Sequence, residues 1–126
     1  MLGLRFLLVR GNSGAVAMSK TRAKGTAFET EVVNYLKEHG FDEAERNVLN
    51  SPLGDIKNIP IVAECKNHKT MTLSEWMKQA EISGTKAGKL WSVIHKRRGK
   101  GVSKTWVTME LDQFVELLKA YETLNP

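Results

Sequence analysis

Hydrophobic residues between positions 27 and 39 recur with the period of an α-helix. They stand at i, i+4, i+7, i+8 and i+11, namely Phe28, Val32, Tyr35, Leu36 and His39. This spacing places them on one face and predicts an amphipathic helix over about residues 27–39. Thr26 is in the position of an N-cap and Gly40 follows the last apolar residue, so we expect the helix to begin and end there.

The next segment contains short stretches with some strand character, separated by turn signals. Residues 45–49 have strand character, a turn is predicted over residues 50–54, and a second short strand begins at Asp55. A tight hairpin over residues 57–60 then leads to a strand over residues 61–66. On that strand, one face carries Val62, Glu64 and Lys66, and the other carries Ile61, Ala63 and Cys65.

A second helix is predicted after this strand. Thr72 and Glu75 have the spacing of a capping box, in which each side chain bonds the backbone N–H of the other residue. Gly84 stands near the end of the helical pattern. The apolar face of this helix comprises Leu73, Trp76, Met77 and Ala80. We therefore expect a helix that packs on the core and ends near Gly84.

The C-terminal third predicts two strands and a last helix. The strands cover residues 90–96 and 105–109, a basic glycine-containing loop joins them, and the helix covers residues 111–121. Its inward residues are expected to be Leu111, Phe114, Val115 and Leu118. The order of elements is α-β-β-β-α-β-β-α, which predicts an α/β fold with a mixed central sheet flanked by helices.

Length and composition limit the organisation of the chain. It has 126 residues, 41% of them hydrophobic, which is enough for one domain with a core and too short for two ordinary domains. Residues 1–17 lack the uninterrupted apolar stretch of a secretory signal, so we expect a flexible extension followed by one folded domain over residues 18–126. No apolar run is long enough for a membrane span, and the single cysteine cannot form an internal disulfide. We expect a cytoplasmic protein without membrane contact.

The chain has a net charge of +5 and two stretches with basic but no acidic residues, one over residues 1–24 and one over residues 82–109. Residues 82–109 contain no acidic residue and seven basic ones, namely Lys86, Lys89, Lys96, Arg97, Arg98, Lys100 and Lys104. Such a stretch is typical of a surface that binds a polyanion, because each neutralised phosphate releases counterions. The alternative is a solvated basic loop that binds nothing.

Two carboxylates and a lysine meet at the predicted hairpin. Two antiparallel strands joined by a tight turn would bring the carboxylates of Asp55 and Glu64 close together. Mg²⁺ binds few carboxylate oxygens and keeps several waters, so this pair is a candidate magnesium site whose shell a substrate phosphate completes. Lys66 shares a face with Glu64 and could orient an attacking water or offset charge in the transition state. The alternative is an ordinary cross-strand ion pair.

The order of these residues resembles that of the PD-(D/E)XK nuclease superfamily. The shared pattern comprises Gly25-x-x-x-Glu29, Gly54-Asp55-Ile56, Glu64-Cys65-Lys66, a helix with Trp76 and Gln79, and a strand ending in Lys96-Arg97-Arg98-Gly99. Within the superfamily, the chain is most similar to the small Holliday junction resolvases of archaea and phages. Gly54 stands where the superfamily has a proline, a departure that removes no ligand.

The resemblance implies a fold, an activity and a set of site residues. The fold is a restriction-endonuclease-like core, and the activity is hydrolysis of phosphodiester bonds in branched DNA with Mg²⁺, for which Mn²⁺ would substitute. The implied catalytic residues are Glu29, Asp55, Glu64, Lys66 and Gln79. The implied metal contacts are the carboxylates of Asp55, Glu64 and Glu29 and the backbone carbonyl of Cys65.

Helix geometry separately favours Glu29 over Glu31 as the acid of the first helix. At about 100° per residue, Glu29 lies roughly 50° from the centre of the apolar face and Glu31 lies roughly 110° from it. Glu29 also has capping-box spacing to Thr26, so a purely structural role is the alternative. For Gln79 the alternative is an ordinary exposed helix residue. The Cys65 side chain is expected in the core.

The predicted DNA contacts are basic side chains on both sides of the candidate metal site. They are Arg22, Lys24, Lys69, Lys86, Lys89, Lys96, Arg97, Arg98, Lys100 and Lys104. His68 is a weaker candidate for a DNA contact. The three tryptophans, Trp76, Trp91 and Trp106, are expected to be structural.

The implied activity cuts a four-way junction by two symmetric nicks. Because an assembly with two-fold symmetry has two equivalent active sites, we expect a homodimer. The candidate dimer surface is the apolar remainder of the last helix, Leu117, Tyr121 and Leu124. Two other functions stay open. One is a related restriction, repair or end-processing nuclease, and the other is a basic DNA-binding module without catalysis.

Overall fold

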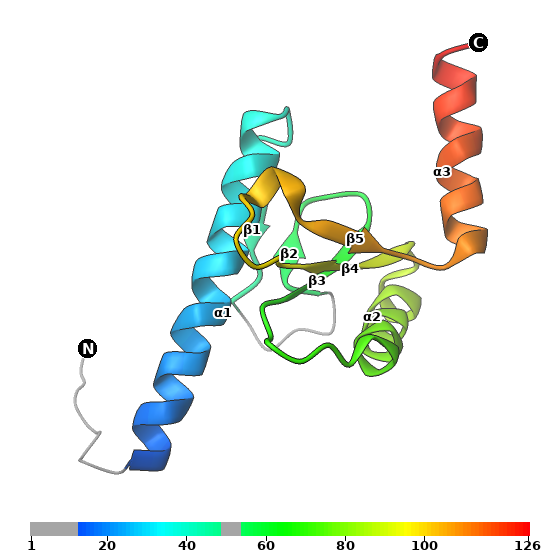
Figure 1. Ribbon diagram of the computed structural model, residues 1–126. Helices are drawn as coiled ribbons and strands as arrows, with labels where there is room; N and C mark the ends of the chain where they lie inside the picture. The colour runs from blue at the N-terminus through cyan, green and yellow to red at the C-terminus, as the bar shows by residue number, and fades with distance from the viewer. Residues whose placement is uncertain (1–12, 49–53) are drawn as a thin grey trace.

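The computed structural model describes residues 13–48 and 54–126; residues 1–12 of the expected extension and residues 50–53 of the expected turn lie outside this range. The helices and strands follow the predicted order, with one additional short 3-10 helix, η2 (Figure 1). In chain order they are α1 Ser13–Glu38, β1 Glu45–Arg46, β2 Ile56–Lys57, β3 Val62–Lys66, α2 Leu73–Ala87, β4 Trp91–His95, η2 Val102–Lys104, β5 Trp106–Thr108 and α3 Leu111–Leu124. The α/β class is therefore confirmed. None of the helices in the described ranges has the length and apolar character that crossing a membrane requires.

The first helix begins much earlier than the hydrophobic pattern predicted. Thr26 lies inside α1, where its carbonyl accepts a hydrogen bond of 2.9 Å from the Thr30 hydroxyl. The predicted N-cap at Thr26 and its capping box with Glu29 are therefore wrong. The helix also runs across residue 17, where we expected the extension to end. Residues 13–24 contain good helix formers but no apolar stripe, so periodicity could not detect this part of the helix.

The strands form two small sheets instead of the single central sheet that we predicted. One sheet is the antiparallel pair β1–β2, with Arg46 opposite Ile56. In the other, β4 lies between β3, to which it is parallel, and β5, to which it is antiparallel. The predicted hairpin between β2 and β3 is wrong as a strand pair, because β2 pairs with β1. A backbone hydrogen bond of 2.9 Å from the Asp55 N–H to the Ala63 carbonyl still joins the two segments.

The core consists of two clusters, one packed by α1 and the other by α2. Phe28, Val32 and Val33 of α1 pack with Ala63 and Cys65 of β3. Trp76 and Ala80 of α2 pack with Val93 of β4. Glu64 is opposite Val93 in the parallel register, so it shares the face that α2 covers. The predicted alternation of β3 is therefore confirmed.

The second helix has the predicted apolar face but different ends. It continues past Gly84 to Ala87, and Gly88 follows it in a left-handed conformation at φ 65°. A Cβ atom on Gly84 would lie 2.5 Å from Cε3 of Trp91, so glycine is needed here because β4 approaches closely. Thr72 occupies the N-cap position without a side-chain capping bond, so the predicted capping box is not formed.

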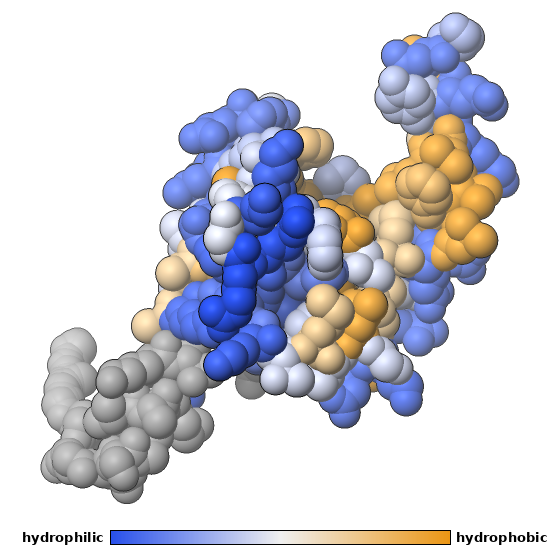
Figure 2. Space-filling view, in the orientation of Figure 1, coloured by the Kyte–Doolittle hydropathy of each residue, from blue (hydrophilic) through white to orange (hydrophobic). Residues whose placement is uncertain are grey.

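The residues of α3 that we expected to face inward are exposed. These are Leu111, Phe114, Val115 and Leu118. In Figure 1 the helix stands apart from the rest of the chain, and Figure 2 shows hydrophobic surface along its lower half. The buried member of α3 is Gln113, whose Oε1 accepts a hydrogen bond of 2.6 Å from the Trp91 N–H. Periodicity thus identifies a helix and its apolar face but not whether this chain covers that face.

Candidate active site

A cleft of about 810 Å³ is lined by residues of α1, α2, β3 and the segments that flank the β1–β2 sheet. Three carboxylates from three parts of the chain line it. Glu29 comes from α1, Asp55 from the residue before β2, and Glu64 from the middle of β3. The structure therefore brings together the acids that the sequence pattern placed in one site. Gln79, on α2, lines the same cleft.

Asp55 is held against β3 by two hydrogen bonds that involve different parts of the residue. Its carboxylate accepts a bond of 2.7 Å from the Cys65 N–H, and its own N–H donates to the Ala63 carbonyl. Burial raises the pKa of Asp55, while the bond from Cys65 and the charges of Lys66 and Arg46 oppose that rise. The hydrogen bond therefore fixes the orientation of a carboxylate that is partly desolvated.

The backbone before Asp55 has a conformation that requires glycine at position 54. Gly54 has φ +92°, a conformation that proline cannot adopt. A Cβ atom at this position would also lie 2.9 Å from Cγ1 of Val62 and 3.0 Å from the Ala63 carbonyl oxygen. Only glycine lets the chain approach β3 closely enough here to place Asp55 beside Cys65.

Glu64 is a buried carboxylate, with 3% of its surface exposed. Among the described residues, no hydrogen bond or salt bridge reaches its side chain; Lys66, two residues along the same face, bonds Gln79 instead. Burial and the charge of Asp55 raise the pKa of Glu64 to about 7, with Lys66 acting in the opposite direction. Such a group is costly to keep ionised without a cationic partner.

Glu29 reaches the cleft from α1 and pairs with Arg46 of β1. The Arg46 Nε lies 3.1 Å from the Glu29 Oε1, and another guanidinium nitrogen donates to the Thr26 hydroxyl over 3.3 Å. Burial and the charge of Asp55 raise the pKa of Glu29, and Arg46 and Lys66 lower it. Sequence reasoning missed Arg46, because a basic residue on a two-residue strand carries no periodic or motif signal.

Lys66 and Gln79 meet at the edge of the cleft. The Lys66 ammonium donates a hydrogen bond of 2.6 Å to the Gln79 Oε1, which joins β3 to α2. Gln79 is therefore bonded to the lysine, a contact that the sequence did not predict. The Cys65 side chain points into the α1 core, where burial raises its thiol pKa well above the ordinary value, so it is not a reactive thiolate.

The carboxylates of the cleft are of the chemical type that Mg²⁺ uses as ligands. Within the described residues, no group of three or more His, Cys, Asp or Glu side chains is placed so that it could hold a metal ion. Mg²⁺ does not need such a group, because it is commonly held by one or two carboxylates with waters and substrate phosphate. Asp55 and Glu64 supply two carboxylates on one cleft, and the buried Glu64 lacks a cationic partner within bonding distance in the described chain.

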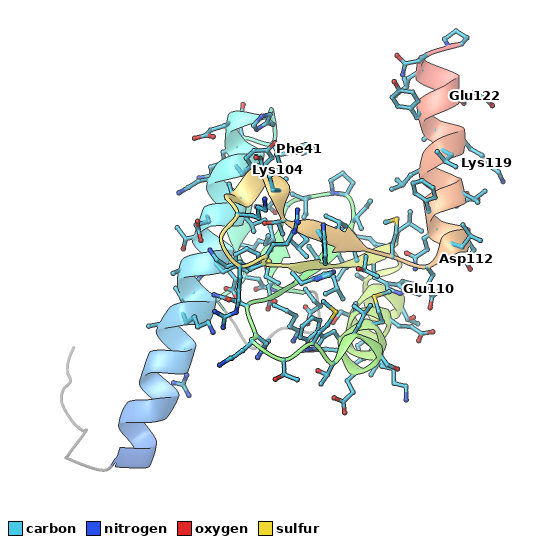
Figure 3. All side chains as sticks on the ribbon, viewed as in Figure 1. Phe41, Lys104, Glu110, Asp112, Lys119 and Glu122 are labelled. Carbon is cyan, nitrogen blue, oxygen red and sulfur yellow. The ribbon has the colours of Figure 1, made fainter. Side chains whose placement is uncertain are left out.

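The predicted DNA-binding residues lie in two separate places. Two hollows at the C-terminal end of β3 and β4 are lined by Lys24, Lys69, Lys96, Arg97 and Arg98, and Arg22 lines the main cleft. Figure 2 shows a band of strongly hydrophilic residues over the loop after β4. This loop continues through Lys100 to Lys104, which is labelled in Figure 3.

Lys86 and Lys89 do not join this group. They precede β4, whereas Lys96 follows it, so the length of the strand separates them from the other basic residues. Lys89 bonds the Ile59 carbonyl over 3.4 Å and lines a different hollow. The run of seven basic residues in the sequence is therefore not one continuous surface.

Comparison of the chain with known protein families, with curated proteins and with solved structures found no match.

Proposed function

We propose that this protein is a Mg²⁺-dependent endodeoxyribonuclease of the PD-(D/E)XK type, with a restriction-endonuclease-like core. The observation that carries the proposal is the meeting of Glu29, Asp55 and Glu64 in one cleft, with Lys66 beside them. These residues come from separate elements, and their order along the chain resembles that of the superfamily. Structural ion pairing alone does not account for Glu64, which is buried without a bonded cation among the described residues.

In this proposal, Asp55 and Glu64 hold the ion beside the Cys65 carbonyl, and Glu29, which pairs with Arg46, lines the same cleft. When bound, Mg²⁺, or Mn²⁺ in its place, supplies a Lewis acid for the phosphate and lowers the pKa of bound water. Asp55 is kept in place by the Cys65 N–H, so its carboxylate needs little reorganisation on binding. Lys66, oriented by Gln79, offsets the negative charge that develops on the phosphate when water attacks it.

The proposed substrate is branched DNA, and a four-way junction is the substrate that the resemblance favours. The basic hollows beside the cleft provide phosphate contacts for duplex arms that lead to the cutting site. A related restriction, repair or end-processing nuclease would use the same cleft on another DNA shape. A basic DNA-binding module without catalysis would need neither Asp55 nor Glu64. The proposed location is the cytoplasm, or the cytoplasm of a host cell if a phage encodes the chain.

The proposed assembly is a homodimer, and α3 offers the surface for it. Tyr121 and Leu124 are 68% and 80% exposed, and Leu117 also lies on the uncovered helix. A 14-residue helix is marginally stable by itself in water, so a second copy that covers its apolar face would stabilise it. Two copies would also supply the two cuts that resolve a junction.

The proposal is tested by incubating the purified protein with labelled four-way junction, flap, duplex and single-stranded DNA. We expect Mg²⁺-dependent nicking of opposite strands of the junction and none in EDTA. Equal cutting of all four substrates would favour the general nuclease. Binding without any cutting in Mg²⁺ or Mn²⁺ would favour the DNA-binding module.

A further inference from the structure

A second hollow, of about 280 Å³, adjoins the candidate active site along β3 and combines aromatic rings with basic side chains. Lys66 lines it, and Glu64, two residues earlier on the same strand face, lines the main cleft. The residues around it come from β3, α2, β4 and β5 and from the loops that follow β3 and β4. Among the residues that line this hollow, Lys66 is the one to which we assign a role in catalysis.

Four rings form a continuous series along one side of the hollow. The centroids of His68 and Trp76 are 5.6 Å apart, those of Trp76 and His95 are 5.9 Å apart, and those of His95 and Trp106 are 5.9 Å apart. The strand register explains the last pair, because His95 lies opposite Trp106. These are ordinary separations for interacting aromatic side chains.

The inner rings hold the outer ring in place. Trp76 and His95 are buried, and the His95 Nε2 is 2.8 Å from the Thr108 hydroxyl. Trp106 is 51% exposed, although it is a large aromatic residue on a strand. The Arg97 guanidinium lies 4.4 Å from the centroid of the Trp106 ring, which limits the movement of both side chains. The indole is thus an ordered aromatic surface open to solvent.

Positive charge surrounds this surface. Lys66, Lys69, Lys96, Arg97 and Arg98 line the hollow, and no acidic residue is among the described residues that do so. Lys96 is paired with Glu31 at 3.1 Å, but the other four form no salt bridge within the described chain. A ligand suited to the hollow therefore has a flat ring to stack and a negative charge close to it.

We propose that this hollow binds an unpaired nucleobase of a DNA strand, with Trp106 stacking on the base and the basic residues contacting its flanking phosphates. Exposed aromatic rings and arginine planes stack on bases released from a duplex, and neighbouring cations follow the backbone. The inference rests on the proposed DNA-nuclease function. It adds that a strand with an unpaired base binds beside the cleft. Such binding would make branched DNA a better substrate than continuous duplex DNA.

The test compares two labelled single strands of about ten nucleotides in EDTA, one of oligothymidylate and one abasic with the same number of phosphates. Fluorescence anisotropy measures the binding of each strand to the full chain. We expect the wild-type protein to bind oligothymidylate about five- to 150-fold more tightly than the abasic strand. Equal affinity for the two strands would overturn the inference.

Variants of the strand β5 assign the preference to the indole. Trp106→Ala is expected to remove the preference for bases and to leave the affinity for the abasic strand unchanged. Trp106→Phe is expected to keep most of the preference for bases. Val107→Ala is the matched control, because this exposed neighbour lies on the opposite face of the strand. If Trp106→Ala weakens binding of both strands equally, the indole only positions Arg97 and the inference is wrong.

The same measurements separate this inference from the proposed function, because binding in EDTA needs no cleavage. A protein that prefers bases but never cuts DNA would contradict the nuclease and leave the base site standing. A protein that cuts junctions but binds both strands equally would contradict the base site alone. Urea unfolding of each variant checks that its fold is intact.

Discussion

Replacing Glu64 by glutamine should stabilise the metal-free protein at alkaline pH. The side chain is buried, and its pKa is raised from 4.5 to about 7 by burial and by Asp55. The folded chain therefore holds this proton more tightly than the unfolded chain does. As pH rises from 4.5 through 7, wild-type stability falls by about 3 kcal/mol through this one group. Glutamine is neutral throughout, so it removes this pH dependence.

The expected gain is smaller than the full electrostatic term, because a buried amide that lacks a partner has its own cost of about 1–3 kcal/mol. Subtracting this cost from about 3 kcal/mol, we expect Glu64→Gln to be more stable than the wild type by up to about 2 kcal/mol at pH 8. At pH 5 the advantage should disappear. Urea unfolding in EDTA at pH 5, 6, 7 and 8 measures the difference. Glu81→Gln, on an exposed position of α2, is the matched control.

Magnesium should reverse the order of stability. A ligand that binds only the folded state stabilises it by about 2.7 kcal/mol at a hundred times its dissociation constant, which exceeds the advantage expected for Glu64→Gln. We expect Mg²⁺ to raise the unfolding free energy of the wild type and of Glu81→Gln at pH 8, and to change that of Glu64→Gln little. If Glu64→Gln is no more stable than the wild type in EDTA, and Mg²⁺ stabilises both equally, the reasoning about this carboxylate is refuted.

Three further predictions concern parts of the molecule away from Glu64. Gly84→Ala should destabilise the fold by about 1–3 kcal/mol, measured by urea unfolding, because its Cβ would overlap the β4 indole; an unchanged midpoint would contradict the packing. Arg97→Ala with Arg98→Ala should weaken binding to every DNA tested and lower the slope of log affinity against log salt by about 1–2, whereas an unchanged slope would mean that neither contacts phosphate. Leu117→Glu with Tyr121→Glu should convert a dimer to a monomer in sedimentation at micromolar concentration, and a wild-type monomer would exclude α3 as a dimer surface under those conditions.

Local patterns predicted the elements well and their partners less well. Strand alternation predicted that the side chains of Glu64 and Cys65 lie on opposite faces of β3. The structure confirms this, because α1 packs on one face of β3 and α2 on the other. The sequence also predicted that the second strand pairs with the third, but in the structure the second strand, β2, pairs with β1. Strand pairing depends on which backbone groups meet in space, and two-residue strands carry almost no signal of it.

The helix boundaries show where hydrophobic periodicity loses information. The first half of α1 has no apolar stripe, so Thr26 looked like a cap although it lies inside the helix. Gly84 looked like a terminator, and its actual reason is the close approach of Trp91. The apolar face of α3 was identified correctly, but a period does not say whether the same chain or another one covers it.

For the candidate site, the order of residues carried more information than their spacing. It selected Glu29, Asp55, Glu64, Lys66 and Gln79, all of which meet at or beside one cleft. It did not find Arg46, whose pairing with Glu29 depends on a sheet that the sequence hardly marks. It also merged Lys86 and Lys89 with basic residues at the other end of β4, because distance along a chain is not distance in the fold.

If the acids of the cleft carry out metal-dependent cleavage, Asp55→Asn should abolish cutting. The Asn side chain keeps an oxygen that can accept the Cys65 N–H, so the fold should persist while the negative ligand is lost. Asp42→Asn, on an exposed turn residue, is the control. On a labelled four-way junction in Mg²⁺, we predict that the wild type and Asp42→Asn cut, and that Asp55→Asn binds at least as tightly but does not cut. A folded Asp55→Asn protein that cuts at the wild-type rate would contradict the account.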